Sequence, residues 1–142
     1  MKPRTILLPL ALSLAAGCAS TGYADDRASR DLALYRAHIA EEVGSIPFSG
    51  SVDRWTGLGD RALAVWTSPG RAWLLELHSA CPDLDHSFGI RFDSRDGRID
   101  AGFDAVIPTN NAGMDIPCRI DRIYRIDVQA MREAERAQGS GT

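Results

Sequence analysis

The densest group of side chains that could bind a metal ion lies in the segment CPDLDHS. Asp83, Asp85 and His86 place two carboxylates and an imidazole close together, and such groups coordinate several divalent cations. An ordinary polar loop after a proline accounts for the same composition. His38 and His78 stand at no spacing typical of metal ligands, either with each other or with His86. We therefore expect a polar loop here and keep a metal site as the alternative.

Hydrolytic chemistry would need a nucleophile, a base and an orienting acid close together in space. The chain has serines and histidines, but it has no Gly-x-Ser-x-Gly sequence and no glycine-rich phosphate loop. A triad assembled from distant residues stays open. We expect a protein without catalytic residues or cofactor, with an envelope hydrolase as a rival hypothesis.

The tryptophans could contact a partner, because exposed aromatic rings are common at recognition surfaces. Trp73 shares the apolar face of its predicted strand and is expected in the core. Trp66 lies on the strand face opposite Leu63 and Val65. Either the sheet is covered on both faces, or this ring is partly exposed. We take Trp66 as the candidate contact surface.

The charge of the chain argues against nucleic acid as a partner. The formal net charge is −3, whereas nucleic-acid binding requires a positive surface. Arg119, Arg122 and Arg125 recur near the C-terminus and could bind a carboxylate or phosphate. Because acidic residues are in excess, we expect these arginines to form cross-strand ion pairs instead.

The first residues have the organisation of a signal peptide, which we assign to residues 1–17. Lys2 and Arg4 precede an apolar run over residues 6–16, which is shorter than the roughly 20 residues of a membrane-spanning helix. The run ends in Leu14-Ala15-Ala16-Gly17-Cys18, which resembles the lipobox of bacterial lipoproteins. Leu14 lies four residues before the cysteine, where the commonest pattern has it three before.

The lipobox resemblance implies that Cys18 becomes the mature N-terminus and carries acyl chains, which would hold the protein on a membrane. Ordinary secretory cleavage, with Cys18 free, is the alternative. Ala19 follows where an aspartate commonly signals inner-membrane retention. The resemblance therefore implies an outer-membrane anchor with the domain in the periplasm, and an envelope protein as a possible partner.

With Cys18 lipidated, Cys81 and Cys118 remain, and an even number of thiols in an oxidising compartment indicates one disulfide. In the chain-entropy model, a loop of about 37 residues contributes roughly 4 kcal/mol. A metal site or a redox-active pair lacks the close cysteine spacing that such chemistry uses.

The elements that would position these residues follow from periodicity. After a tether over residues 18–28, Asp26 or Ser29 could cap a helix that continues to Gly44. Residues 62–67 and 73–77 flank a Ser-Pro-Gly turn and predict a hairpin. A second hairpin is predicted from the alternation over 88–93 and 98–103, with Asp96-Gly97 at its turn.

The last strand is predicted over residues 118–126, with a bulge where the alternation slips. Asp127 could cap a short C-terminal helix that carries Val128 and Met131. About six strands between two terminal helices predict a mainly β (α+β) fold, either a small antiparallel sheet or a partly closed barrel. It would form one domain over residues 29–137, followed by a disordered tail over 138–142.

Several segments over residues 30–130 resemble a family of small bacterial lipoproteins classed as a domain of unknown function. The most specific are the segment from Trp55 to Trp66, Cys81-Pro82, Phe103-Asp104 and Cys118-Arg119-Ile120. The resemblance implies a secreted domain with its two cysteines paired, and it assigns no activity. We therefore expect a binding or structural module of the envelope, with a small-ligand or metal-binding protein as the alternative.

Overall fold

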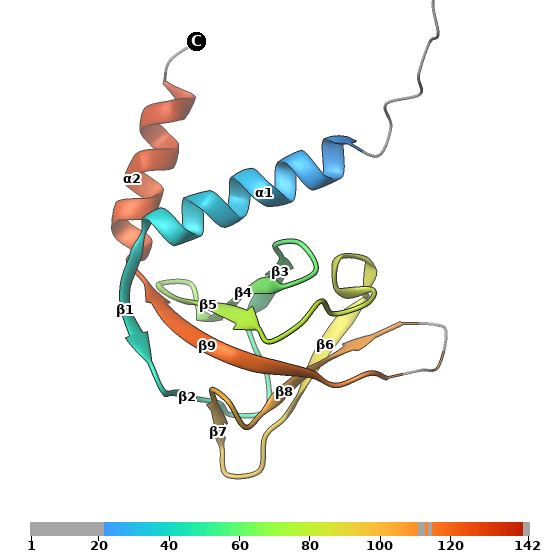
Figure 1. The fold of residues 1–142 in the computed structure, drawn as a ribbon. Helices are drawn as coiled ribbons and strands as arrows, with labels where there is room; N and C mark the ends of the chain where they lie inside the picture. Colours follow the sequence, from blue (N-terminus) through green and yellow to red (C-terminus); the bar gives the residue numbers. More distant parts are fainter. Residues whose placement is uncertain (1–21, 111–112, 114, 141–142) are drawn as a thin grey trace, which may run out of the picture.

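The computed structural model describes residues 22–110, 113 and 115–140. Strands dominate this part of the chain, and an α-helix stands at each end (Figure 1). The elements are α1 (Gly22–Ala37), β1 (Ile39–Val43), β2 (Ser45–Pro47), β3 (Arg54–Gly57), β4 (Ala62–Ser68), β5 (Arg71–Leu77), the 3₁₀ turn η1 (Leu84–His86), β6 (Gly89–Asp93), β7 (Arg98–Asp100), β8 (Ala105–Thr109), β9 (Cys118–Ile126) and α2 (Val128–Gly139).

The main sheet has seven antiparallel strands in the order β3-β4-β5-β9-β8-β6, with β1 also paired to β9. Strand β9 is central. β5 pairs along most of its length, β1 pairs with its C-terminal half, and β8 pairs with its first residues. Strands β2 and β7 form a separate two-stranded sheet. The mainly β fold predicted from the sequence is confirmed, and the sheet is not closed into a barrel.

A bulge in β9 shifts the alternation of its side chains by one residue. Glu76 pairs with Arg122 but Leu77 pairs with Ile120, so Asp121 is the additional residue. Before the bulge Ile120 faces the inner core, and after it Ile123 faces the same core although the residue numbers change parity. The predicted bulge is therefore confirmed, and it keeps one strand in register with a curved sheet.

The sheet separates an inner and an outer core, because alternate residues of a strand point to opposite faces. On β4, Leu63 and Val65 face the inner core, whereas Ala64 and Trp66 face the outer core. Figure 1 shows α1 and α2 on the same side of the sheet, where they cover the outer core. The predicted hairpin of β4 and β5 is confirmed, with Val65 opposite Trp73.

The N-terminal helix differs from its prediction at both ends. It begins at Gly22, so residues 22–28 of the expected tether are helical, and it ends at Ala37 instead of continuing to Gly44. Residues 39–43 form β1 and pair with β9. The β-branched residues Ile39 and Val43 suit a strand, and a helix-like spacing of apolar residues does not reveal a partner far along the chain. Residues 18–21 lie outside the described part.

The second predicted hairpin is wrong in its pairing. Gly97 has a φ of 69°, so the turn uses the left-handed conformation that the Asp96-Gly97 pair predicts. However, β6 pairs with β8 and β7 pairs with β2. The backbone N–H of Phe48 donates to Gly97 O at 2.8 Å, which joins the turn to the β2 segment. Alternation identifies strands but not their partners.

The C-terminal helix forms as predicted. The Asp127 side chain accepts a hydrogen bond from Ala130 N at 3.0 Å, and Val128 and Met131 are buried. The helix extends through Gly139, so the first two residues of the expected tail are helical, while residues 141–142 lie outside the described part. Among the described residues, no helix is long and apolar enough to cross a membrane.

Candidate functional site

Trp66 is buried, which corrects the expectation of a partly exposed contact ring. Only 3% of the residue is exposed, because both helices cover its face of the sheet. Its indole N–H donates to the hydroxyl oxygen of Tyr35 at 3.2 Å. The guanidinium carbons of Arg54 and Arg132 lie 3.9 and 5.9 Å from the ring centroid. The other reading of the sequence, a sheet covered on both faces, is confirmed.

A hollow of about 370 Å³ lies beside this ring, between the two helices and the edge of the sheet. We call it the Trp66 hollow and define it by its lining residues: Tyr35 from α1, Arg54 and Thr56 from β3, Trp66 from β4, and Met131, Arg132 and Glu135 from α2. Four elements, the two helices and the strands β3 and β4, therefore meet at one site.

The positions of the lining residues follow from register and helix periodicity. Arg54 is the direct cross-strand partner of Trp66, and such pairs lie about 5 Å apart between Cβ atoms. On α2, Met131 is buried under the helix, while Arg132 and Glu135 are spaced three residues apart on one helical side. Arg132 also donates to Pro69 O at 2.5 Å, which fixes α2 to the turn between β4 and β5.

Hydrogen-bond donors dominate the hollow. In the described part of the chain, Arg54 stacks on Trp66 and forms no ion pair. The Tyr35 oxygen accepts from Trp66, which leaves its own O–H available to donate. Glu135 contributes a carboxylate against the two guanidinium groups of the lining. The site is thus suited to an acceptor that carries negative charge.

Burial raises the pKa of Tyr35 above its ordinary value of 10.0, and this effect exceeds the opposing influence of the Trp66 hydrogen bond and the Arg54 charge. Desolvation disfavours the charged phenolate. The phenol therefore remains protonated at neutral pH and keeps its O–H donor.

The predicted Asp83, Asp85 and His86 group forms a single 3₁₀ turn on the surface. Asp83 has a φ of 61° and its carboxylate accepts from the Asn110 amide at 3.2 Å. Asp85 packs against Gly57, where a Cβ atom would collide with its carboxylate. Asp85 and His86 also line a hollow of about 720 Å³ below the first half of α1. Within the described ranges, no three residues of metal-binding type converge.

The predicted disulfide is present in the structure. Cys81 and Cys118 are bonded, with their Cα atoms 5.7 Å apart. Both cysteines lie in the inner core, where Cys81 is 1% exposed and Cys118 is 6% exposed. The bridge connects the segment before η1 to the first residue of β9. The neighbouring Leu84 is buried in the inner core, so it anchors the turn that carries Asp83 and Asp85 to that core.

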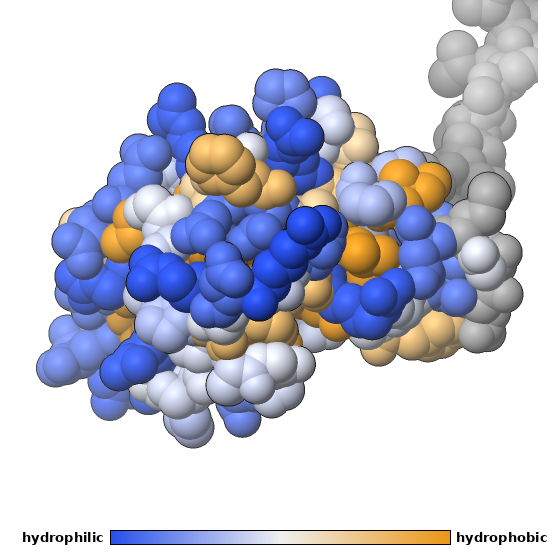
Figure 2. Space-filling model, turned by 90° about the horizontal axis from the view of Figure 1, so that it is seen from below, coloured by the Kyte–Doolittle hydropathy of each residue, from blue (hydrophilic) through white to orange (hydrophobic). Residues whose placement is uncertain are grey.

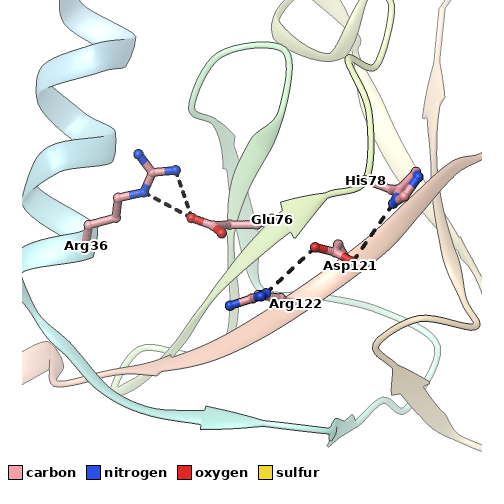
Figure 3. A network of polar contacts seen from close by, with 5 residues as sticks. All are labelled: Arg36, Glu76, His78, Asp121 and Arg122. Atoms are coloured by element: carbon pink, nitrogen blue, oxygen red, sulfur yellow. Dashed lines mark hydrogen bonds and ion pairs between the residues drawn. The ribbon is translucent and has the colours of Figure 1, made fainter.

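The histidines occupy separate surroundings. His78 lies 4.0 Å from Asp121, which also lies 3.8 Å from Arg122 (Figure 3). His38 directly follows α1, and its Nδ1 atom lies 2.8 Å from Leu34 O. In the described part of the chain, none of the hydrogen bonds joins a serine hydroxyl to a histidine ring. The serine and histidine pair that a hydrolase requires is not assembled by those bonds.

Ion pairs join α1 to the sheet and β1 to its neighbour β9. Both Nε and one terminal nitrogen of Arg36 donate to Glu76, at 3.0 and 2.9 Å, and join α1 to β5 (Figure 3). Arg125 of β9 donates to Glu41 of β1 at 2.7 Å. The two residues are cross-strand partners, so the predicted cross-strand ion pair is confirmed for Arg125. Arg122 instead pairs with Asp121 of its own strand.

Tyr35, Arg54 and Arg132 were not predicted as site residues from the sequence. Only the register of β3 against β4 places Arg54 opposite Trp66, and only the packing of α2 brings Arg132 to the same ring.

The face of the molecule seen from below is mainly hydrophilic, with apolar residues between the polar ones (Figure 2). The exposed Phe88 lies in the bend before β6, and the exposed Phe103 lies in the turn after β7.

Comparison of this sequence with curated proteins and with solved structures found no match. One family model, by contrast, matches the chain over its whole length and agrees with the resemblance to a domain of unknown function. The chain belongs to the family of unknown function DUF6491, whose model spans residues 1–142.

Proposed function

We propose that the protein is a lipoprotein of the bacterial envelope, anchored through Cys18 in the outer membrane and exposed to the periplasm. The segment Leu14 to Cys18 supports this proposal by its resemblance to a lipobox, and it lies outside the described residues. The bond between Cys81 and Cys118 is the structural observation that supports it best, because disulfides persist in oxidising compartments such as the periplasm.

The domain would act as a binding or structural module without chemistry of its own. In support, several polar side chains of the described residues are engaged in ion pairs, and others line the Trp66 hollow, where donors dominate. A second protein of the envelope is the proposed partner. The alternative, a metal-binding protein that uses Asp83, Asp85 and His86, has less support, because Asp83 already accepts from Asn110.

The anchor is tested by expressing the full chain in a Gram-negative host and measuring the mass of the mature N-terminal peptide. Acyl chains on Cys18 and recovery with the outer membrane are expected. Cys18→Ala should release the protein into the soluble periplasmic fraction, whereas Ser20→Ala should remain with the membrane. An unmodified Cys18 peptide in the wild type would contradict the proposal.

The binding role is tested by crosslinking in cells that produce the wild type or Cys18→Ala, followed by purification under denaturing conditions. A crosslinked partner found with the wild type and lost with Cys18→Ala would support an interaction at the membrane. Crosslinked products that are identical for an unrelated lipoprotein of similar size would argue against a specific module.

A further inference from the structure

We propose that the Trp66 hollow binds a small oxyanion, either a carboxylate or a phosphate group, between Arg54, Arg132 and Tyr35. The inference rests on the proposed binding function and adds the chemistry of the ligand. It does not depend on the Cys18 anchor, so a failed anchoring experiment and a failed anion titration are separate results.

The lining of the Trp66 hollow is locally positive. Two guanidinium groups and one carboxylate line the hollow, although the whole chain carries a formal net charge of −3. A local positive site on an acidic protein attracts an anion at short range. The described structure places no carboxylate within ion-pair distance of Arg54, which stacks on Trp66 instead.

The groups that line the hollow can also donate hydrogen bonds to a ligand. A guanidinium above an aromatic ring keeps N–H groups for an acceptor, and its planar fork matches a carboxylate or phosphate. The Tyr35 oxygen is occupied by the Trp66 indole, so the phenol contributes a donor. Thr56 adds a hydroxyl to the same lining. Donors from three elements thus face one space.

The size of the hollow restricts the ligand. A volume of about 370 Å³ lies near the lower end of the range for small-molecule sites. It suits a single charged group with a short substituent. The anion could be a free solute or the phosphate of a lipid headgroup, because both present the same oxygens to the arginines.

Glu135 provides a test within the site itself. It is the acidic member of the lining and would compete with an incoming anion for the same cations. Glu135→Gln should therefore tighten anion binding. If the hollow serves only to close the outer core, no anion binding should be detected with the wild type or with Glu135→Gln.

The experiment uses the full chain purified in a nonionic detergent and labelled with ¹⁵N. The chain has three tryptophans, and the Trp66 indole resonance is assigned with Trp66→Phe. Inorganic phosphate and acetate are titrated at constant ionic strength, with chloride as the reference. We expect a saturable shift of the Trp66 indole resonance and little change at Trp55 and Trp73, which lie outside the hollow.

Arg54→Gln should weaken the affinity at least tenfold, and Tyr35→Phe should weaken it while the spectrum stays that of a folded protein. Arg95→Gln, which removes the same charge from the exposed turn before β7, is the matched control and should leave the affinity within twofold. The proposal is overturned if neither anion gives a saturable shift with the wild type and Glu135→Gln, or if Arg95→Gln weakens binding as much as Arg54→Gln.

The source of the anion is distinguished by comparing glycerol 3-phosphate with dihexanoylphosphatidylglycerol in the same titration. Tighter binding of the second would support a lipid headgroup as the ligand. Equal or tighter binding of the first would support a free anion. If neither compound binds and phosphate and acetate give no response, the proposed anion site is contradicted.

Discussion

Replacing both Cys81 and Cys118 by alanine removes the covalent link between the segment before η1 and the start of β9. The two cysteines are separated by 37 positions in the sequence. In the chain-entropy model, opening a loop of this length lowers the free energy of unfolding by about 4 kcal/mol. A small domain has about 5–15 kcal/mol in total, so the bridge accounts for a large part of the stability.

The surroundings of the bridge favour a full effect. Both cysteines are buried in the inner core, so alanine introduces no polar group, and the lost sulfur atoms add a small packing term. The bridge also holds the buried Leu84 near β9. Without it, η1 is expected to open more often than the rest of the sheet.

Urea unfolding of the oxidised wild type and the double variant measures this difference, with Cys18→Ala in both to exclude a third thiol. At a slope of about 2 kcal/mol/M, the loss corresponds to a shift of roughly 2 M in the midpoint. Reduction of the wild type should give a similar shift. A loss below about 1 kcal/mol would contradict this prediction, because the loop would then be constrained in the unfolded chain as well.

Four further outcomes are expected. Ile123→Ala should lower the free energy of unfolding by about 2–5 kcal/mol in chemical denaturation, because the side chain is fully buried in the inner core; Arg95→Ala should change it little. Asp127→Ala should cost about 1 kcal/mol through the lost α2 cap, and helical content by circular dichroism should stay near that of the wild type. The folded state holds the Tyr35 proton more tightly than the unfolded state, so stability should fall as the pH rises above about 10; Tyr35→Phe should reduce that dependence, and an identical pH profile would contradict the pKa assignment. Divalent cations should leave the melting temperature unchanged, and an increase that Asp85→Asn abolishes would restore the metal site at residues 83–86.

Features that depend on neighbouring residues were predictable from the sequence. The hairpin of β4 and β5 follows from two alternating segments around a Ser-Pro-Gly turn, and the Asp127 cap follows from an aspartate before an apolar spacing. The bulge at Asp121 was visible because the apolar residues of β9 change parity. Each of these signals lies within a few residues of the feature that it predicts.

Features that depend on distant partners were not predictable in this way. Residues 39–43 continue the apolar spacing of α1, and only their pairing with β9 makes them a strand. The strands β6 and β7 read as one hairpin, but their partners are β8 and β2. The candidate site was the least predictable feature, because Arg54, Trp66 and Arg132 come together only through strand register and helix packing.

The central place of β9 has a consequence for the order of folding. This strand lies near the C-terminus, yet β1, β5 and β8 all pair with it. Pairing between distant segments slows folding, because loop-closure entropy is lost before the contacts form. During synthesis, the first strand therefore has no partner until almost the whole chain has emerged. A chain truncated before residue 118 would expose the edges of three strands, so we expect it to aggregate instead of forming a smaller stable domain.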